Sequence, residues 1–330
     1  MIARRSVWPQ PEVQELARRF VTAADEVYRL QSGQEAECRM FQSIAEQGHY
    51  GGRERPSSTR QGIYAMTAGG QFLASVNSND PRVVAEMLRQ AWRRWQDLSP
   101  DERSRPAITR RPDSKVPRAD QLYPINGLVL HVYSRDLPRE QAPSDWRGRS
   151  WNQDFAWFRA EEAATLVPSD SHQGAEAAVP EALIRRLARL HLVDNVRGQT
   201  DFFAEQDVKQ ASLASKVTAV TGDLVSLEYR GNTHTQAEGR WPVAGFRQGI
   251  ADEPQKRGYI AEWLGTATFD RRQRRFVAFE LVVLGDRWGG TQFNGRADDL
   301  DPHPMGIAFT LAKDIPAERV APAFIYAYGW

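Results

Sequence analysis

The stretch at residues 213–230, LASKVTAVTGDLVSLEYR, decides the fold of the second half of the chain. Apolar residues alternate with polar ones on both sides of Thr221-Gly222-Asp223, which is the period of a half-buried β-strand. The short segment between the two runs indicates that they form a hairpin. Further strands of this kind are predicted at 259–269, 275–284 and 307–311. The sequence therefore predicts a series of antiparallel hairpins.

Helices are predicted upstream of these hairpins. Leu183, Ile184 and Leu187 recur at helical spacing within a predicted helix at 180–192. A strand is expected at 128–134 and a short helix within 151–166. The predicted architecture is an antiparallel sheet, strongly curved or a partial barrel, with helical cover, so the chain as a whole is α+β. Long loops are expected at 241–255 and 288–303, where function tends to be located.

The first third of the chain shows a different pattern. Asp80 and Pro81 open a helix whose apolar stripe includes Val84 and Leu88, and Ser99 and Pro100 end it. Other elements upstream of this helix are predicted as helices at 12–18 and 35–47 and as strands at 20–27, 62–67 and 72–76. This order predicts an α/β sandwich.

The run Ser58-Thr59-Arg60-Gln61-Gly62-Ile63-Tyr64, followed by the hairpin and the Asp80-Pro81 helix, resembles the second half of a thioredoxin fold. The resemblance places Thr59-Arg60 near the cis-proline position of that family. The chain has no CxxC motif, so the resemblance implies a thioredoxin-like domain without redox activity. The whole chain is also similar to bacterial proteins of the same two-part layout whose activity is uncharacterised.

Length and composition indicate two domains. A chain of 330 residues exceeds what one hydrophobic core usually organises. The segment near 99–120 is rich in Pro, Arg, Ser and Asp, which is typical of a solvated linker. We predict a thioredoxin-like domain at 1–105, a linker at 106–120 and a β-rich α+β domain at 121–330.

The balance of charge and the cysteine content exclude several classes of protein. Lys plus Arg total 43 against 42 for Asp plus Glu, so we expect neither nucleic acid nor a membrane surface as a partner. The single cysteine, Cys38, excludes an intramolecular disulfide. No signal peptide is readable and no run is long enough for a membrane helix, which predicts a soluble, cytoplasmic protein, or an extracytoplasmic one if the start site is misassigned.

The most informative polar cluster is His191 with Asp194. On a helix these positions share a face, so the two side chains are candidates for a base with its orienting group, and Asn195 and Arg197 add an amide and a cation. The alternative is a core histidine, a structural ion pair and a helix C-terminus.

Two other clusters are candidates for binding. The loop 298–304 contains three aspartates and His303, and His191, Asp301 and His303 are candidate metal ligands. A solvated loop is the alternative, because the spacing matches no known metal motif. Aromatic and polar side chains that are expected to line a ligand pocket are Trp151, Asn152, Asp154 and Trp288.

These observations favour a binding or interaction protein whose β-rich domain takes a small molecule or peptide. The first alternative is a metal-dependent or acid/base enzyme centred on His191 and Asp194; the second is a thiol enzyme that uses Cys38. The sequence names no cofactor. The apolar segment from Ala321 to Trp330 is expected to pack back on its own domain or to contact a partner chain.

Overall fold

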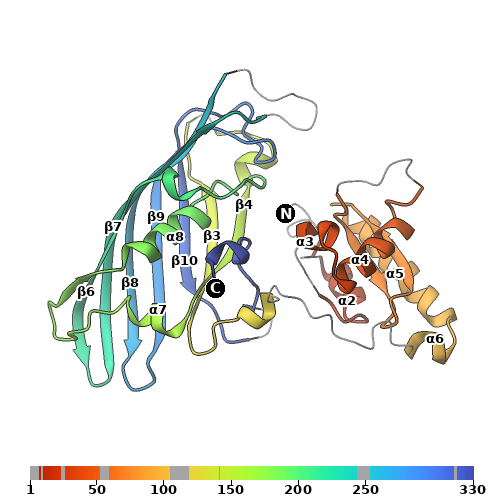
Figure 1. The fold of residues 1–330 in the computed structure, drawn as a ribbon, viewed down its shortest axis with the longest axis horizontal. Coiled ribbons are helices and arrows are strands. Elements are labelled where there is room, and N and C mark those ends of the chain that lie inside the picture. The colour runs from red at the N-terminus through yellow and green to blue at the C-terminus, as the bar shows by residue number, and fades with distance from the viewer. Residues whose placement is uncertain are drawn as a thin grey trace. The chain divides into compact units, whose positions relative to one another are not determined.

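The structure is a computed structural model. It describes residues 7–8, 10–23, 27–52, 59–104, 119–140, 142–243, 253–315 and 318–330. The chain forms two compact units, Met1–Val116 and Pro117–Trp330 (Figure 1). The division falls inside the predicted linker at 106–120, but residues up to 118 of that linker lie outside the described residues, so the linker stays a prediction.

The N-terminal unit packs helices against one β-hairpin. Its helices are α2 (Pro11–Ala17), α3 (Val27–Ser32), α4 (Ala36–Gln47), α5 (Pro81–Asp97) and α6 (Pro100–Ser104), and its strands are β1 (Ile63–Met66) and β2 (Phe72–Val76). β1 and β2 pair antiparallel, which confirms the predicted hairpin.

Helix α5 begins where the sequence predicts. The Asp80 side chain accepts a hydrogen bond from the backbone N–H of Arg82 at 2.8 Å, and Pro81 occupies the first turn, where no intrahelical N–H partner is needed. The predicted apolar stripe, including Val84 and Leu88, is buried in the core of this unit.

The predicted strand at 20–27 is wrong. Phe20 to Ala23 form no regular element, residues 24–26 lie outside the described residues, and α3 begins at Val27. Val21 is fully exposed, and the Phe20 ring instead packs edge-on against Trp92 of α5, with ring centroids 6.3 Å apart. A β-prone run with no neighbouring strand has nothing to pair with, so its apolar residues pack individually.

The C-terminal unit is built on one eight-stranded antiparallel sheet in the order β4-β3-β10-β9-β8-β7-β6-β5 (Figure 1). Its strands are β3 (Leu128–Asp136), β4 (Trp151–Phe158), β5 (Glu176–Ala178), β6 (Val208–Thr221), β7 (Leu224–Gly239), β8 (Gln255–Asp270), β9 (Arg275–Trp288) and β10 (His303–Leu311). The predicted antiparallel hairpins are confirmed, and the strands extend well beyond their predicted ends.

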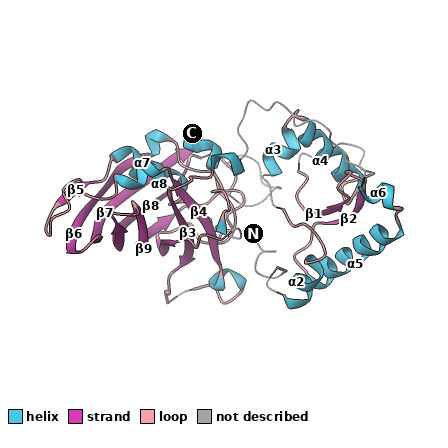
Figure 2. Cartoon of the chain, turned by 90° about the horizontal axis from the view of Figure 1, so that it is seen from below, coloured by secondary structure: helices cyan, strands magenta, loops and turns pink. Residues whose placement is uncertain are grey.

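The inner face of this sheet is covered by helices (Figure 2). Helix α8 (Glu181–Leu190) packs against β6 and β7 and buries the predicted stripe that includes Ile184 and Leu187. Inward-facing residues of β7 to β10, such as Trp263 and Phe309, complete the core. Alternation along each strand therefore separates a filled inner face from an outer face.

The predicted helix at 151–166 is mostly wrong, because residues 151–158 form strand β4 and only α7 (Ala160–Ala164) is helical. The aromatic residues of this segment fit helical and strand spacing about equally well. Pairing of β4 with β3, from Leu128 opposite Phe158 to Arg135 opposite Trp151, favours the strand.

The C-terminal segment packs back on its own unit, as expected. Ile325 and Tyr328 are buried in a cluster with Phe155 and Trp157 of β4, and Trp157 is only 1% exposed. The backbone N–H of Trp157 donates to the Tyr328 hydroxyl at 3.3 Å, and His191 Nε2 lies 2.6 Å from the same oxygen.

Replacing Tyr328 by Phe removes one hydroxyl and leaves two buried groups, the Trp157 N–H and the His191 ring, without that partner. We expect the free energy of unfolding to fall by about 1–3 kcal/mol, the cost of an unsatisfied buried polar group. Urea denaturation measures this. The matched control is Tyr133→Phe, whose hydroxyl contacts His131 at the surface; equal losses in the two variants would contradict the assignment.

Candidate ligand-binding site

Charged residues stand on the inner face of the sheet where two strands end. In β3 the buried residues Leu130 and Val132 point inward, and Asp136 has the same parity at the end of the strand. In β9 Val283 points inward, and Arg287 follows with the same parity. Charged side chains in these core positions require partners, because an unpaired charge is costly to bury.

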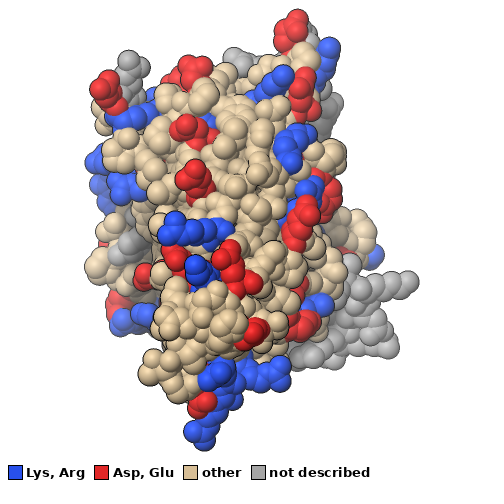
Figure 3. Space-filling view, turned by 90° about the vertical axis from the view of Figure 1, so that its left-hand side faces the viewer, with Lys and Arg blue, Asp and Glu red and all other residues tan. Residues whose placement is uncertain are grey.

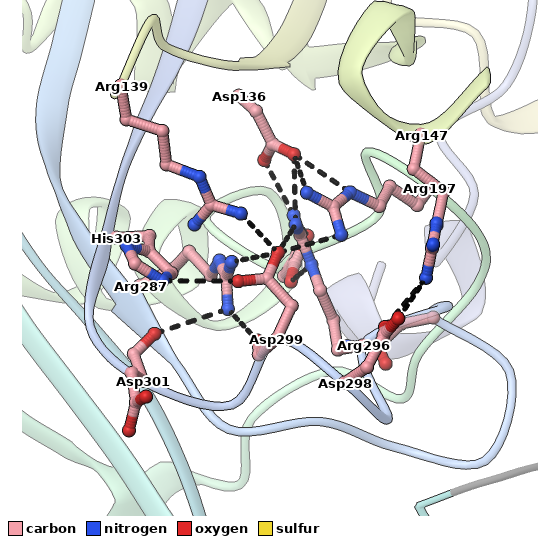
Figure 4. A network of polar contacts seen from close by, with 12 residues as sticks. Asp136, Arg139, Arg147, Arg197, Arg287, Arg296, Asp298, Asp299, Asp301 and His303 are labelled. Carbon is pink, nitrogen blue, oxygen red and sulfur yellow. Dashed lines mark hydrogen bonds and ion pairs between the residues drawn. The ribbon is translucent and has the colours of Figure 1, made fainter. Parts of the chain in front are cut away.

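These partners form a network that we call the arginine–aspartate cluster (Figure 4). Its members are Arg139, Arg197, Arg287, Arg296, Asp136, Asp194 and Asp299. Arg296 is fully buried at its centre. Two of its nitrogens bond both oxygens of Asp194 at 2.7 and 2.8 Å, and two bond both oxygens of Asp136 at 2.7 and 2.9 Å.

Asp299 is the carboxylate that contacts all four arginines of the cluster. Its Oδ2 atom lies 2.9 Å from Arg139, 2.7 Å from Arg197, 2.7 Å from Arg287 and 3.1 Å from Arg296. Burial alone would raise the pKa of Asp299, but hydrogen bonds from Arg139 and Arg287 outweigh it and hold this pKa far below its usual range. The Asp299 carboxylate therefore stays ionised in acid that would protonate an ordinary aspartate.

The cluster joins segments that are far apart in the sequence. It ties the end of β3 to the turn after α8, which carries Asp194 and Arg197, and to the loop between β9 and β10, which carries Arg296 and Asp299. Each arginine has a carboxylate within ion-pair distance, so the cluster acts as a clamp that fixes this end of the sheet.

The outer face of the same strands carries a hollow that we call the β10 groove. Its floor consists of Gly306 and Ala308, the small outward-facing residues of β10. Its walls include Val282 and Leu284 on β9, and Tyr133, Arg135 and Trp151 on β3 and β4. Register explains the shape: Gly306 lies between Leu284 and Arg135, and Ala308 lies between Val282 and Tyr133.

The β10 groove has a volume of about 450 Å³ and a mainly apolar lining. Leu284 is 48% exposed and Trp151 is 42% exposed, although both are large hydrophobic side chains. A Cβ atom at Gly306 would lie 3.1 and 3.2 Å from the side chains of Leu137 and Leu284, so the groove is narrow at this point. Concave apolar surface of this size is typical of small-molecule sites.

The structure gives His191 and Asp194 different partners. His191 Nδ1 lies 3.5 Å from Asp154 Oδ2 and its Nε2 contacts Tyr328, whereas Asp194 bonds Arg296. The His191 side chain is fully buried, and Asp154 also accepts a hydrogen bond from the backbone N–H of Ala323. His191 therefore joins α8 and β4 to the C-terminal segment, and Asp194 belongs to the arginine–aspartate cluster.

The candidate metal ligands are not assembled into a metal site. Among the described residues, no group of three or more His, Cys, Asp or Glu side chains is placed to hold an ion. His303 lies 3.3 Å from Asp299, and partial burial together with Arg139 lowers the pKa of His303. Asp301 is exposed and contributes its backbone carbonyl to Arg287.

The other predicted binding residues are distributed over several places. Trp151 lines the β10 groove, and Arg197 is in the arginine–aspartate cluster. Asn195 accepts a hydrogen bond from the Thr200 N–H, Asn152 lies on β4, and Trp288 ends β9 with its ring near His234. Sequence reasoning missed Asp136, Arg287 and Arg296. For Asp136 and Arg287 the signal was a charged residue at inward parity just beyond the end of a predicted strand, whereas Arg296 lies in a loop that carries no such signal.

Cys38 is buried in α4. Its thiol contacts Glu35, with Sγ 3.2 Å from a carboxylate oxygen. Burial and this contact raise the pKa of Cys38 to about 11, although Arg29 lies nearby. A thiol nucleophile needs the opposite shift.

Comparisons with protein-family models, with curated proteins and with solved structures found no match for this chain. None of the described helices is long and apolar enough to cross a membrane. The face of the molecule in Figure 3 shows Lys and Arg side chains interspersed with Asp and Glu over neutral surface, without a continuous field of one sign.

Replacing Asp299 by Asn leaves three buried guanidinium groups and the partly buried Arg139 with one carboxylate fewer. We expect the free energy of unfolding at pH 7 to fall by about 3–5 kcal/mol, the cost of breaking a buried ion pair. Because the pKa of Asp299 is lowered in the folded protein, its contribution is present above pH ~4 and is lost as pH falls further, so the difference should shrink in acid.

Urea denaturation at pH 7 and pH 3 measures this difference. The control is Asp314→Asn, which removes an exposed partner of Arg319 and should leave stability nearly unchanged. If the Asp299→Asn variant has the same free energy of unfolding as the wild type at pH 7, the arginine–aspartate cluster does not act as a clamp.

Cys38 should react slowly with a thiol reagent in the native protein. At a pKa of about 11, about one thiol in a thousand is ionised at pH 8, and the thiolate is the reactive form. The rate of modification by a disulfide reagent, measured spectrophotometrically, should rise by orders of magnitude in urea. Rapid reaction of the native protein would revive the hypothesis of a thiol enzyme.

Proposed function

We propose that this chain is a binding protein and that its C-terminal unit holds a small apolar ligand in the β10 groove. The single observation that supports this proposal is the floor of Gly306 and Ala308 between the large side chains of β9 and β3. Small residues at adjacent outward positions of one strand leave a trough along it, and burying apolar surface there is favourable.

The groove is well suited to binding because the scaffold beneath it is rigid. On the inner face of the same strands, Ile307 and Phe309 are buried in the core, and the arginine–aspartate cluster fixes the ends of β3 and β9. A preformed site loses little conformational entropy when a ligand binds. The proposed site therefore lies on regular strands, and none of its lining residues belongs to the long loops.

The N-terminal unit is proposed to serve as a thioredoxin-like scaffold without redox activity. The β1–β2 hairpin followed by α5 is consistent with the part of the fold that the resemblance concerns. The buried, weakly acidic Cys38 supports the absence of thiol chemistry.

Filling the groove should abolish binding. Ala308→Leu places a branched side chain on the floor, and we expect it to weaken binding of a neutral two-ring probe, 2-naphthamide, at least about tenfold, because the probe and the new side chain compete for the same volume. Calorimetry and saturation-transfer NMR measure the affinity.

The matched control is Ala278→Leu, an equally conservative change at an exposed position of β9 that does not line the groove. This variant should bind the probe as wild type does. Absence of binding to the wild type, or equal binding to the Ala308→Leu variant, would refute the proposed site.

A further inference from the structure

Among the described residues that line the β10 groove, Arg135 is the single charged one. It points outward from β3, directly opposite Gly306 on one side and Trp151 on the other, and it is exposed. Within the described part of the chain, the structure shows neither a hydrogen bond nor an ion pair to the Arg135 guanidinium. A cation with five donors thus stands at the edge of apolar surface without an acceptor.

In this respect Arg135 differs from the arginines on the inner face of the same strand end. On the inner face of the same strand end, every arginine of the arginine–aspartate cluster has a carboxylate within 2.9 Å. Across the groove, Asp286 stands at an outward position of β9, opposite Pro304 of β10. Because β10 lies between β9 and β3, these two strands are separated by two strand spacings of roughly 4.8 Å each. The side chains of Val282 and Leu284 form the wall of the groove on the β9 side.

We infer that the ligand of the β10 groove is an aromatic carboxylate, whose ring lies on the apolar floor and whose carboxylate pairs with Arg135. This inference rests on the proposed function of the groove. A guanidinium can bond a carboxylate through two parallel N–H···O contacts, and the apolar wall strengthens such a pair by excluding water.

The neighbouring rings favour an aromatic body. Tyr133 precedes Arg135 by two residues on β3, and Trp151 lies opposite Arg135 on β4. Their ring centroids are 6.4 Å apart and their planes are inclined by 38°. The Tyr133 hydroxyl lies 2.9 Å from His131 Nδ1, which holds the ring in place and directs its polar end away from Arg135. Flat apolar groups stack on such rings.

The same lining disfavours a phosphate. A phosphate dianion needs several donors or cations, and the groove offers one guanidinium among apolar side chains. A groove with one cation and an apolar floor is complementary to a ligand that carries a single negative charge on an apolar body.

The test compares 2-naphthoate with 2-naphthamide, which have the same rings and nearly the same shape but differ in charge. We expect the wild-type protein to bind the acid about tenfold more tightly than the amide, by calorimetry at low salt. The Arg135→Gln variant should bind both probes alike, at about the wild-type affinity for the amide, because the apolar floor is intact.

The matched control is Arg230→Gln, which alters an exposed arginine of the same sheet outside the groove and should keep the wild-type ratio. If the wild type binds acid and amide equally, or if Arg135→Gln leaves the ratio unchanged, the inference is wrong while the groove stays a binding site. If neither probe binds the wild type, the proposed function fails and the inference fails with it.

Discussion

The pairing of buried Arg296 with Asp136 and Asp194 is the interaction on which the C-terminal unit depends. A guanidinium with no exposed surface is tolerated only if each of its donors has an acceptor, and here two carboxylates approach it in bidentate fashion. Because those carboxylates belong to β3 and to the turn after α8, the charge can be buried only when both segments are in place. Long-range order in this unit is thus enforced by electrostatics as well as by the apolar core.

The two faces of the sheet have different roles: the inner face packs the core, and the outer face carries the β10 groove. Inward residues of β10, such as Ile307 and Phe309, fill the core, whereas its outward residues, Gly306 and Ala308, leave space. One strand thereby contributes stability on one side and a groove on the other. The alternation that a strand imposes on its side chains makes this possible without any irregular backbone at the groove floor.

The sequence predicted periodic elements well and spatial combinations poorly. Hairpins at 213–230 and at β8 and β9 follow from alternation and turn residues, and α5 and α8 follow from their apolar stripes and end signals. Segment 151–158 was mistaken for a helix because its aromatic spacing suits both periods, and only pairing with β3 decides between them. The shape of the groove depends on how neighbouring strands are aligned with β10, and the arginine–aspartate cluster depends on contacts between segments far apart in the sequence. Neither the alignment nor these contacts can be derived from the spacing of residues within one segment.

The edges of the sheet carry a consequence for solubility. At β4 the outward backbone groups of Trp157 are already occupied, since its N–H meets Tyr328 and its carbonyl accepts from Arg186 at 3.2 Å. The opposite edge strand, β5, is only three residues long and pairs only with Ala214 to Lys216 of β6. At β4, an incoming strand from another molecule would find both of these backbone groups of Trp157 occupied. The contacts with Tyr328 and Arg186 therefore protect this part of the border against edge-to-edge aggregation, and losing the last few residues of the chain would open it.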